Sequence, residues 1–463
     1  MEKKNYVCSE CGAQAPRWMG KCATCGAWNT LKEEIIGGKS SKIALENLNT
    51  AIKIREVETE SIERIKTNIG EFNRVMGGGI VPDSMTILSG PPGGGKSTLA
   101  LAVCQDLANQ GYNVLYASGE ESETQIKNRA TRILGDTINE NIWILSGDSL
   151  DAVVKEVKSK DIDLVIIDSI QTFTLAEFLP ARAGNPVQTM ECSNELLKLA
   201  KSGSKKRAII IIGQMNKQEQ LAGLRALEHL VDTVLIIDGE SEEELRAVTS
   251  TKNRFGSTGE IGFFRMTEHG MVSVDNPSEY FITDREDEVS GVALTVIREG
   301  TRPIISEIES LTSTSFTPYP SRVTENMSKD KLNTLISILE QKGKVYLNTK
   351  NVVVKAMGNI KLKDNGSNLA IIMSIVSAVK NKSINGKTIF IGDVGLTGEI
   401  KKVPCMETRI KELDRLGFEK VYVAKEAISA LPKFKNIEVI PCKTLLEVIR
   451  NVFGNINEEE KDE

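Results

Sequence analysis

A glycine-rich run near residue 90 carries the clearest chemistry in this sequence. It follows a short apolar stretch and precedes a run rich in alanine and leucine, which is the order of a strand, a loop and a helix. Glycines let backbone N–H groups converge on phosphates, while a lysine and a serine at the helix start supply a positive charge and a ligand for Mg²⁺. A Gly/Pro turn that happens to precede a lysine is the alternative, but both flanks favour a site for ATP and Mg²⁺. The loop comprises Gly90, Pro91, Pro92, Gly93, Gly94, Gly95, Lys96, Ser97 and Thr98.

Acidic residues end two further apolar runs. Asp168 closes one of them, the Walker-B arrangement, so we expect it to hold Mg²⁺ beside Ser97. Glu120 and Glu121 follow another run, and either carboxylate could polarise the water that attacks the γ-phosphate, with Glu120 the first choice. Both glutamates could instead be solvated charges at a helix start. Gln171 could sense the γ-phosphate or simply lie at the surface.

Four of the eight cysteines form two Cys-x2-Cys pairs near the start of the chain. Two such pairs separated by a short loop can place four thiolates around Zn²⁺, and disulfides are the weaker alternative in a cytoplasmic chain. Because all the ligands are thiolates, the site is expected to be structural. Trp18 and Trp28 either form a contact surface or cover the metal. The expected zinc ligands are Cys8, Cys11, Cys22 and Cys25.

Length and composition indicate a protein of several domains. A chain of 463 residues exceeds what one core usually supports, so two or three domains are expected. There is no long apolar run and no signal-peptide pattern, which predicts a cytoplasmic location and no membrane partner. The net charge of −5 argues against indiscriminate binding to polyanions but leaves room for a local basic surface.

The apolar runs after residue 65 are mostly β-branched and do not alternate with polar residues. Such runs are typical of strands buried on both faces, which predicts an α/β fold with a largely parallel sheet between helices. Strands are expected at 86–88, 114–117, 164–167, 208–212 and 233–237. The expected organisation is a zinc module at 1–30, a polar linker at 31–64, an ATPase domain at 65–275, a second domain at 287–455 and an acidic tail at 456–463.

Residues 276 to about 325 contain several prolines and a polar run, with one strand expected at 291–297. Beyond them, helical and strand patterns alternate. Helices are expected at 329–341, 368–381 and 407–416, and strands at 351–357, 388–394 and 420–423.

Two cations flank an asparagine in Lys252-Asn253-Arg254-Phe255-Gly256, which we call the KNRFG segment (residues 252–256). It could be an exposed turn, a basic tip that reaches the nucleotide of a neighbouring copy, or a contact to DNA phosphates. Composition alone does not choose among these.

The ordered motifs resemble the RadA/Sms family of bacterial recombination and repair ATPases over nearly the whole chain. They are the four-cysteine module, GPPGGGKST, YASGEES, VIIDSIQT, LEHLVDTVL and KNRFG. The resemblance implies a RecA-like core, a homohexameric ring, ATP hydrolysis coupled to movement on single-stranded and branched DNA, and a recombinase of the RecA type as partner. It also implies that Lys252 and Arg254 couple nucleotide state to DNA between subunits. The resemblance also implies that the loops holding Arg182, Lys217 and Arg225 stand where RecA-like proteins present DNA-binding loops. These residues are therefore candidate phosphate contacts, although each could be a solvated charge.

The second domain resembles the Lon-protease-like domain that ends this family. Ser367 falls at the nucleophile position of the protease, but Arg409 stands where the lysine base should be. An arginine cannot lose its proton in a protein, so it cannot activate a serine. Lys411 could take that role only in a different helix register. We therefore favour a DNA helicase, with an ATP-gated signalling module as the alternative and an ATP-dependent serine protease as the least favoured function.

Overall fold

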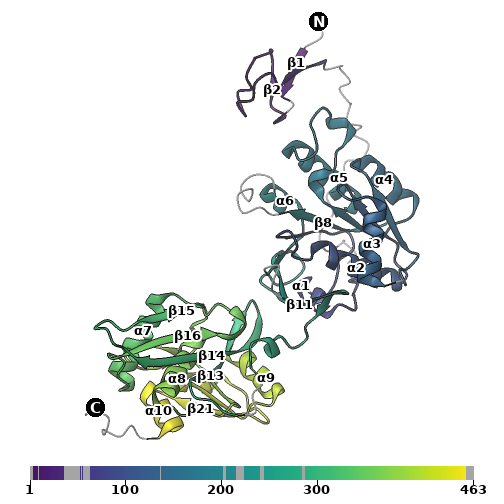
Figure 1. Ribbon diagram of the computed structural model, residues 1–463. Coiled ribbons are helices and arrows are strands. Elements are labelled where there is room, and N and C mark those ends of the chain that lie inside the picture. Colours follow the sequence, from purple (N-terminus) through teal and green to yellow (C-terminus); the bar gives the residue numbers. More distant parts are fainter. Residues whose placement is uncertain are drawn as a thin grey trace. The chain divides into compact units, whose positions relative to one another are not determined.

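The computed structural model describes residues 4–8, 10–35, 53, 55, 63–135, 137–201, 205–214, 224–239, 244–283 and 287–454. The chain divides into two compact units, residues 1–275 and 276–463 (Figure 1). Every helix within the described ranges is too short or too polar to cross a membrane.

The first residues form a small antiparallel sheet ordered β2-β1-β3. Leu31 starts its third strand and packs with Cys8 and Cys22 in the small core of this module. The predicted linker therefore does not begin at residue 31, because that residue is needed to close the module's core. The remainder of the predicted linker lies largely outside the described residues. The strands are β1 (Lys4–Cys8), β2 (Gln14–Ala15) and β3 (Leu31–Ile35).

The rest of the first unit is built on one sheet, in which nine described strands follow the order β12-β11-β10-β9-β4-β8-β7-β5-β6. The six strands from β9 to β6 are mutually parallel, and β10, β11 and β12 continue the sheet in antiparallel fashion. The predicted largely parallel sheet is confirmed. The strands are β4 (Met85–Gly90), β5 (Val114–Ser118), β6 (Ile142–Ser146), β7 (Leu164–Asp168), β8 (Ala208–Gln214), β9 (Thr233–Asp238), β10 (Leu245–Asn253), β11 (Ile261–Thr267) and β12 (Gly270–Ser273).

Helices cover both faces of this sheet (Figure 1). Side chains alternate along each strand, so Tyr116 packs toward one set of helices while Leu115 and Ala117 pack toward the other. Both faces are apolar, which explains why the strands read as continuous hydrophobic runs. One face carries α1 (Gly70–Val75), α2 (Lys96–Asn109) and α3 (Glu123–Leu134); the other carries α4 (Leu150–Ser159), α5 (Pro186–Lys201) and α6 (Leu224–Leu230).

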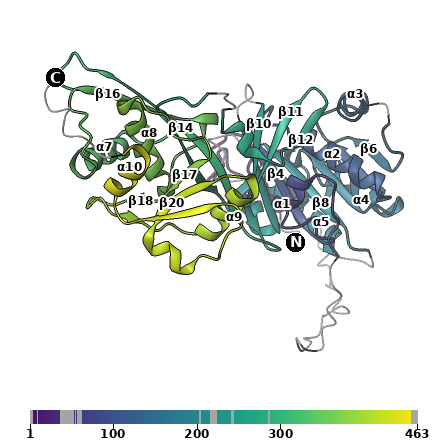
Figure 2. The ribbon, with the colours of Figure 1, turned by 90° about the horizontal axis from the view of Figure 1, so that it is seen from below.

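The second unit contains a described sheet ordered β15-β16-β14-β13-β17-β20-β21 and a small β18-β19 pair. Figure 2 labels β14, β16, β17 and β20 of this sheet. Helix α9 packs on the sheet through Met406, Ile410 and Leu413, and α8 packs against β13, β14 and β17. The strands are β13 (Val292–Glu299), β14 (Arg302–Thr314), β15 (Arg322–Thr324), β16 (Lys350–Ala356), β17 (Thr388–Ile391), β18 (Asp393–Val394), β19 (Ile400–Lys401), β20 (Lys420–Ala424) and β21 (Glu438–Cys442). The helices are α7 (Lys329–Ile338), α8 (Asn368–Lys380), α9 (Met406–Leu416) and α10 (Leu445–Phe453).

Two boundaries in this unit differ from the sequence expectation. The unit begins at residue 276 rather than 287, because Ser278 Oγ accepts a hydrogen bond from Ile305 N and Phe281 O accepts one from Glu307 N. Strand β14 also runs through the polar stretch that had no predicted strand. Its polar residues are tolerated because they pair along β16.

Candidate nucleotide site

The glycine-rich loop joins the end of β4 to the start of α2. Gly95 caps the helix with a φ of 100°, a left-handed conformation that strains residues with a side chain, and a Cβ at that position would also lie 2.6 Å from Met271 Sδ. The Lys96 amine donates to the carbonyl oxygens of Gly90 and Pro91, each at 2.8 Å. Burial lowers the pKa of Lys96, while the charges of Asp168 and Glu120 raise it. The loop thus presents a lysine flanked by two carboxylates.

A hydroxyl and a carboxylate meet beside this lysine. Ser97 Oγ donates to Asp168 Oδ2 over 2.8 Å, and the Tyr116 hydroxyl donates to the same oxygen. Burial raises the pKa of Tyr116, so the phenol stays protonated and remains a donor. Serine and carboxylate oxygens are the ligands that Mg²⁺ prefers, so these groups fit the expected ion. No motif of the sequence predicts a role for Tyr116, although a lone tyrosine inside an aliphatic strand signals a hydroxyl that needs a partner.

The two glutamates after β5 have different partners. Ser118 Oγ accepts hydrogen bonds from the backbone N–H groups of both residues, which fixes the turn. Glu120 Oε1 accepts a hydrogen bond from Ser169 Oγ over 2.5 Å, next to the end of β7. Glu121 instead forms an ion pair with Arg129 of α3. Glu120 is therefore the carboxylate that lies near Lys96 and Asp168, whereas Glu121 holds α3 in place through its ion pair with Arg129.

The connection between β7 and α5 holds further candidates. Gln171 Oε1 is buried, and among the described residues it has no hydrogen-bond partner. Such an orphaned acceptor is unusual in a folded chain and is consistent with a ligand-facing role. Arg182, in the same connection, is exposed. Lys217 lies outside the described residues, and Arg225 lies in α6.

The KNRFG segment lies at the opposite end of the sheet. Strand β10 brings Asn253 opposite Thr233, the first residue of β9, and Thr233 lies beside Thr86 of β4. The glycine-rich loop leaves the other end of β4, after Gly90. Four residues of strand therefore separate the two features, which is about 13 Å of rise.

The individual residues of the KNRFG segment have distinct environments. Asn253 is buried and its Oδ1 accepts from Phe255 N at 2.9 Å, which closes the turn. A Cβ at Gly256 would lie 3.0 Å from the Gly77 Cα, so the close approach of two backbones requires glycine. Lys252 and Arg254 both donate to α6 and its neighbourhood. Asn253 and Gly256 thus shape the turn. Lys252 and Arg254 are not needed for the turn itself, so they are the residues of the segment that could bind a charged ligand.

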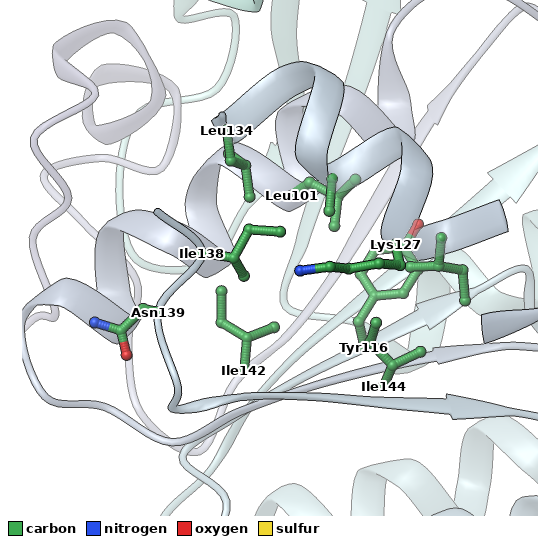
Figure 3. Close-up of a pocket in the computed structure, with 10 residues that line it drawn as sticks. Leu101, Tyr116, Lys127, Leu134, Ile138, Asn139, Ile142 and Ile144 are labelled. Carbon is green, nitrogen blue, oxygen red and sulfur yellow. The ribbon is translucent and has the colours of Figure 1, made fainter. Parts of the chain in front are cut away.

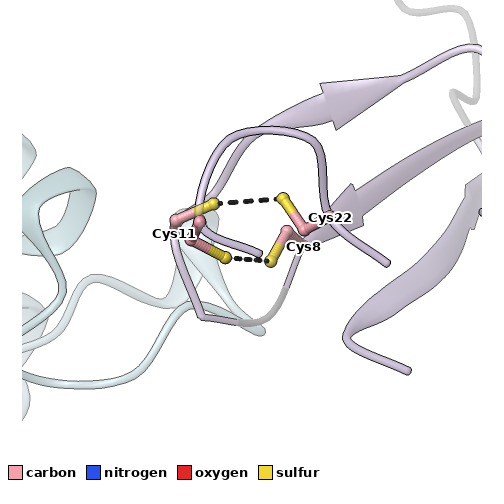
Figure 4. A group of neighbouring side chains, drawn as sticks. Cys8, Cys11 and Cys22 are labelled. Atoms are coloured by element: carbon pink, nitrogen blue, oxygen red, sulfur yellow. Dashed lines mark hydrogen bonds between the residues drawn. The ribbon is translucent and has the colours of Figure 1, made fainter. Parts of the chain in front are cut away.

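The zinc module brings its four cysteines together as expected. All four Sγ atoms lie within 4.8 Å of one another, with 3.5 Å between Cys11 and Cys22 and 3.7 Å between Cys8 and Cys25 (Figure 4). A tetrahedral zinc with Zn–S bonds near 2.3 Å needs sulfurs about 3.8 Å apart, so the residues fit the ion. Backbone N–H groups of Cys25 and Thr24 lower the pKa of Cys22, which favours the thiolate that zinc binds.

Neither tryptophan of the module belongs to the described core around the cysteines. Trp18 is 56% exposed and Trp28 is 70% exposed. The Lys21 amine lies 5.6 Å from the centroid of the Trp28 ring, a cation–π contact. Of the two roles considered for these rings, the structure leaves that of a contact surface.

Two family models match separate parts of the chain. Residues 6–33 match a family model described as a rubredoxin metal binding domain, and residues 52–177 match an AAA domain. The DNA repair protein RadA of Streptococcus pyogenes serotype M3 is 39% identical over 456 residues, covering 98% of this chain and 99% of that protein. The DNA repair protein RadA of Bacillus subtilis strain 168 is 38% identical over 458 residues, again covering 98% and 99%.

The chain belongs to the RadA family of DNA repair proteins. It is an ATPase of that family, with ATP and Mg²⁺ as the ligands of its P-loop and Zn²⁺ as the ligand of its four cysteines. The expected RecA-like α/β fold with an N-terminal zinc ribbon is likewise confirmed.

In the described part of the second unit of this RadA-family chain, the side chains at the expected protease positions are not arranged as a serine and its base. Ser367 is fully buried and its Oγ donates to the Asp364 carbonyl over 2.7 Å. Arg409 points inward, 1% exposed, and its guanidinium forms an ion pair with Asp364 Oδ2 at 2.6 Å. Lys411 lies on the outer side of α9, paired with Glu407 and 64% exposed. The helix register therefore removes Lys411 as a substitute base.

A cavity of about 280 Å³ lies behind the nucleotide site of the RadA-family ATPase (Figure 3). Tyr116 forms part of its wall while its hydroxyl reaches Asp168. Figure 3 shows Lys127 extending its amine toward Ile138 and Ile142. The P-loop residues do not line this cavity, so it is separate from the phosphate site.

Proposed function

We propose that this RadA-family ATPase binds single-stranded DNA and moves along it during ATP hydrolysis, extending branched recombination intermediates. It would act as a homohexameric ring with nucleotide between subunits, in cooperation with a recombinase of the RecA type. The family membership supports the setting in DNA repair, and the two ends of the ATPase sheet support the arrangement of the subunits.

The separation of the KNRFG segment from the chain's own P-loop carries this proposal. Arg254 follows β10 at the amino ends of the parallel strands, whereas Lys96 follows β4 at the carboxyl end. The intervening strand rise, about 13 Å, exceeds the reach of an arginine side chain. A contact between Arg254 and a triphosphate therefore requires the P-loop of another copy. Such contacts repeated head to tail generate a ring when the rotation closes.

The proposed roles follow the positions of the side chains. Lys96 binds the β- and γ-phosphates, Ser97 and Asp168 hold Mg²⁺, and Glu120 orients the attacking water. Mg²⁺ bound there would neutralise charge that develops on the phosphates. Gln171 is proposed to sense the γ-phosphate through its orphaned oxygen. Lys252 and Arg254 are the cations that reach the neighbour, and Arg182, Lys217 and Arg225 are the proposed contacts to DNA phosphates.

The test compares ATP turnover and strand displacement with and without single-stranded DNA. We expect DNA to stimulate turnover in the parent chain, and Lys252→Ala and Arg254→Ala to abolish both the stimulation and the displacement of a strand from a branched substrate. Lys198→Ala is the control, because that lysine is exposed on α5 far along the chain from the segment. Sedimentation with an ATP analogue and DNA reports the ring.

The proposal would be overturned, and a signalling ATPase favoured, if single-stranded DNA did not change the rate of ATP turnover and the chain did not displace a strand. A chain that stays monomeric with both ligands would overturn it as well. Degradation of casein that is lost in Ser367→Ala would instead support the protease function, against the buried position of that serine.

A further inference from the structure

Asp232 is a buried carboxylate between α6 and β9 that the proposed mechanism does not use. It is 2% exposed, and both its backbone and its side chain bind the first residue of β4. Asp232 N donates to Met85 O at 2.8 Å, and Met85 N donates to Asp232 Oδ2 at 3.1 Å. These bonds use one carboxylate oxygen and fix the residue on the P-loop strand.

The other carboxylate oxygen faces cations. Arg254 Nη1 donates to Asp232 Oδ1 at 3.0 Å, and the Lys201 amine lies 3.4 Å from the same oxygen. The backbones of the same two residues are also hydrogen-bonded, since Arg254 N donates to Asp232 O at 3.0 Å. A buried carboxylate with a fixed position is a strong anchor for a guanidinium, because the hydrogen bonds are charge-assisted.

Both cations of the KNRFG segment also bind the last turn of α6. The Lys252 amine donates to Glu228 O, and Arg254 Nη2 donates to His229 O at 3.4 Å. Carbonyl groups at a helix C-terminus lack partners within the helix, and positive charge is favoured there. Asp232 and the end of α6 therefore act together as one seat for Lys252 and Arg254.

The seat leaves Arg254 half exposed. Its side chain is 50% exposed while Asp232 is 2% exposed, so one side of the guanidinium is held and the other faces solvent. A guanidinium presents five N–H donors, and fixing its long side chain in advance lowers the entropy lost when it binds phosphate. An arginine that must act on the triphosphate of a neighbouring copy is more effective when its guanidinium is already oriented before the triphosphate binds.

We propose that Asp232 is a positioning residue that aims Arg254 at the triphosphate bound by a neighbouring copy. This inference rests on the proposed function, because it requires Arg254 to act between subunits. It goes beyond that function by assigning the orientation of the arginine to Asp232, a carboxylate within the LEHLVDTVL motif to which the sequence analysis gave no role.

The Asp232→Asn variant distinguishes a role in orienting Arg254 from a role in folding. An asparagine keeps an oxygen that can accept from Met85 N, but it turns an NH₂ group toward Arg254, so donor faces donor. We expect turnover at saturating ATP and DNA to fall roughly tenfold to a hundredfold. Binding of a fluorescent ATP analogue should change less than about twofold, because Asp232 lies at the far end of β4 from the P-loop. Lys201→Met, which removes the other cation on the same oxygen, should retain near-parental turnover.

Mixed assemblies provide the decisive measurement. A Lys96→Ala chain has a defective P-loop and a sound Arg254, while an Asp232→Asn chain has the reverse. Mixed in equal amounts, about a quarter of the junctions join a sound P-loop to a sound Arg254, so turnover should recover. Arg254→Ala mixed with Lys96→Ala sets the recovery that is attainable. A residue that merely held β4 in place would give no recovery, because the damage would stay with its own P-loop.

The outcomes distinguish this inference from the function on which it rests. Recovery with Arg254→Ala but not with Asp232→Asn would overturn the role of Asp232 and leave the proposed function standing. Failure of both mixtures would remove the arrangement between subunits and both proposals with it. A loss in Lys201→Met equal to that in Asp232→Asn would show that only the charge balance of the carboxylate matters. Asp232→Glu, which keeps the charge but shifts it, repeats the mixture if the asparagine variant does not fold.

Discussion

Ser97 Oγ donates to Asp168 Oδ2 over 2.8 Å, so the first turn of α2 and the last residue of β7 meet at one carboxylate. Asp168→Asn should therefore lower ATP turnover roughly a hundredfold or more, because the amide is a poor ligand for Mg²⁺. The measurement is steady-state phosphate release across a Mg²⁺ titration. Asp161→Asn is the control, since that carboxylate is 73% exposed and pairs only with Lys205 among the contacts described. Equal activity in the two variants would contradict the assignment.

Substitutions of Glu120 and Glu121 should have different effects, one on ATP turnover and the other on stability. Glu120→Gln is expected to reduce turnover roughly a hundredfold while nucleotide binding persists, because the amide cannot accept a proton from water. Glu121→Gln should leave turnover within a few-fold and slightly lower the melting temperature, because it weakens the ion pair with Arg129 on α3. Single-turnover kinetics and thermal unfolding distinguish the two effects. A larger catalytic loss in Glu121→Gln would reverse the roles.

Tyr116 gives the first unit a characteristic alkaline response. Burial, aided by the charge of Asp168, raises the pKa of the Tyr116 hydroxyl above its usual value near 10. The folded chain keeps this proton while the unfolded chain loses it, so the stabilising contribution is complete below about pH 10 and is lost as the pH rises further. Tyr116→Phe should flatten the fall of the unfolding free energy above pH 10. Denaturant titrations at several pH values test this, and identical slopes in both proteins would refute it.

The Arg409–Asp364 pair should be structural. Arg409→Met leaves the Asp364 carboxylate without its guanidinium partner and is expected to cost about 3 kcal/mol of stability in the second unit. Adding Asp364→Asn should recover part of that loss, because the uncompensated charge is removed. Lys411→Met, on the exposed side of the same helix, should change stability little. Urea unfolding measures all three, and an unchanged Arg409→Met chain would rule out this role.

Zinc should stabilise only the first module. Elemental analysis is expected to find one zinc per chain, lost in Cys11→Ser. Removing the metal should unfold the small module, whose core is little more than Cys8, Ala15, Cys22 and Leu31. In a chain carrying Trp143→Phe, tryptophan emission comes only from Trp18 and Trp28 and therefore reports the module, while calorimetry follows the larger units. A metal-free chain with unchanged tryptophan emission would contradict a structural role for zinc.

The sequence by itself determined the features that depend on neighbours along the chain. A phosphate-binding loop needs glycines, a lysine and a serine at fixed spacing, and a zinc knuckle needs two cysteines one turn apart, so both are legible without a fold. Continuous β-branched runs likewise specify strands buried on both faces. The boundaries at residues 31 and 276 were not predicted from the sequence, because the strand at 31–35 and the turn at 277–280 are fixed by partners distant in sequence.

Tertiary structure alone decided which side chains meet. Glu120 and Glu121 are adjacent and chemically alike, and only the positions of Ser169 and Arg129 separate them. The partners of Tyr116 and Asp232 lie 52 and 147 residues away in the chain. The placement of KNRFG at the far end of the sheet from the P-loop follows from the antiparallel direction of β10, which no local pattern encodes. Strand direction is set by the packing of the whole sheet, and it places the KNRFG segment beyond the reach of the chain's own P-loop.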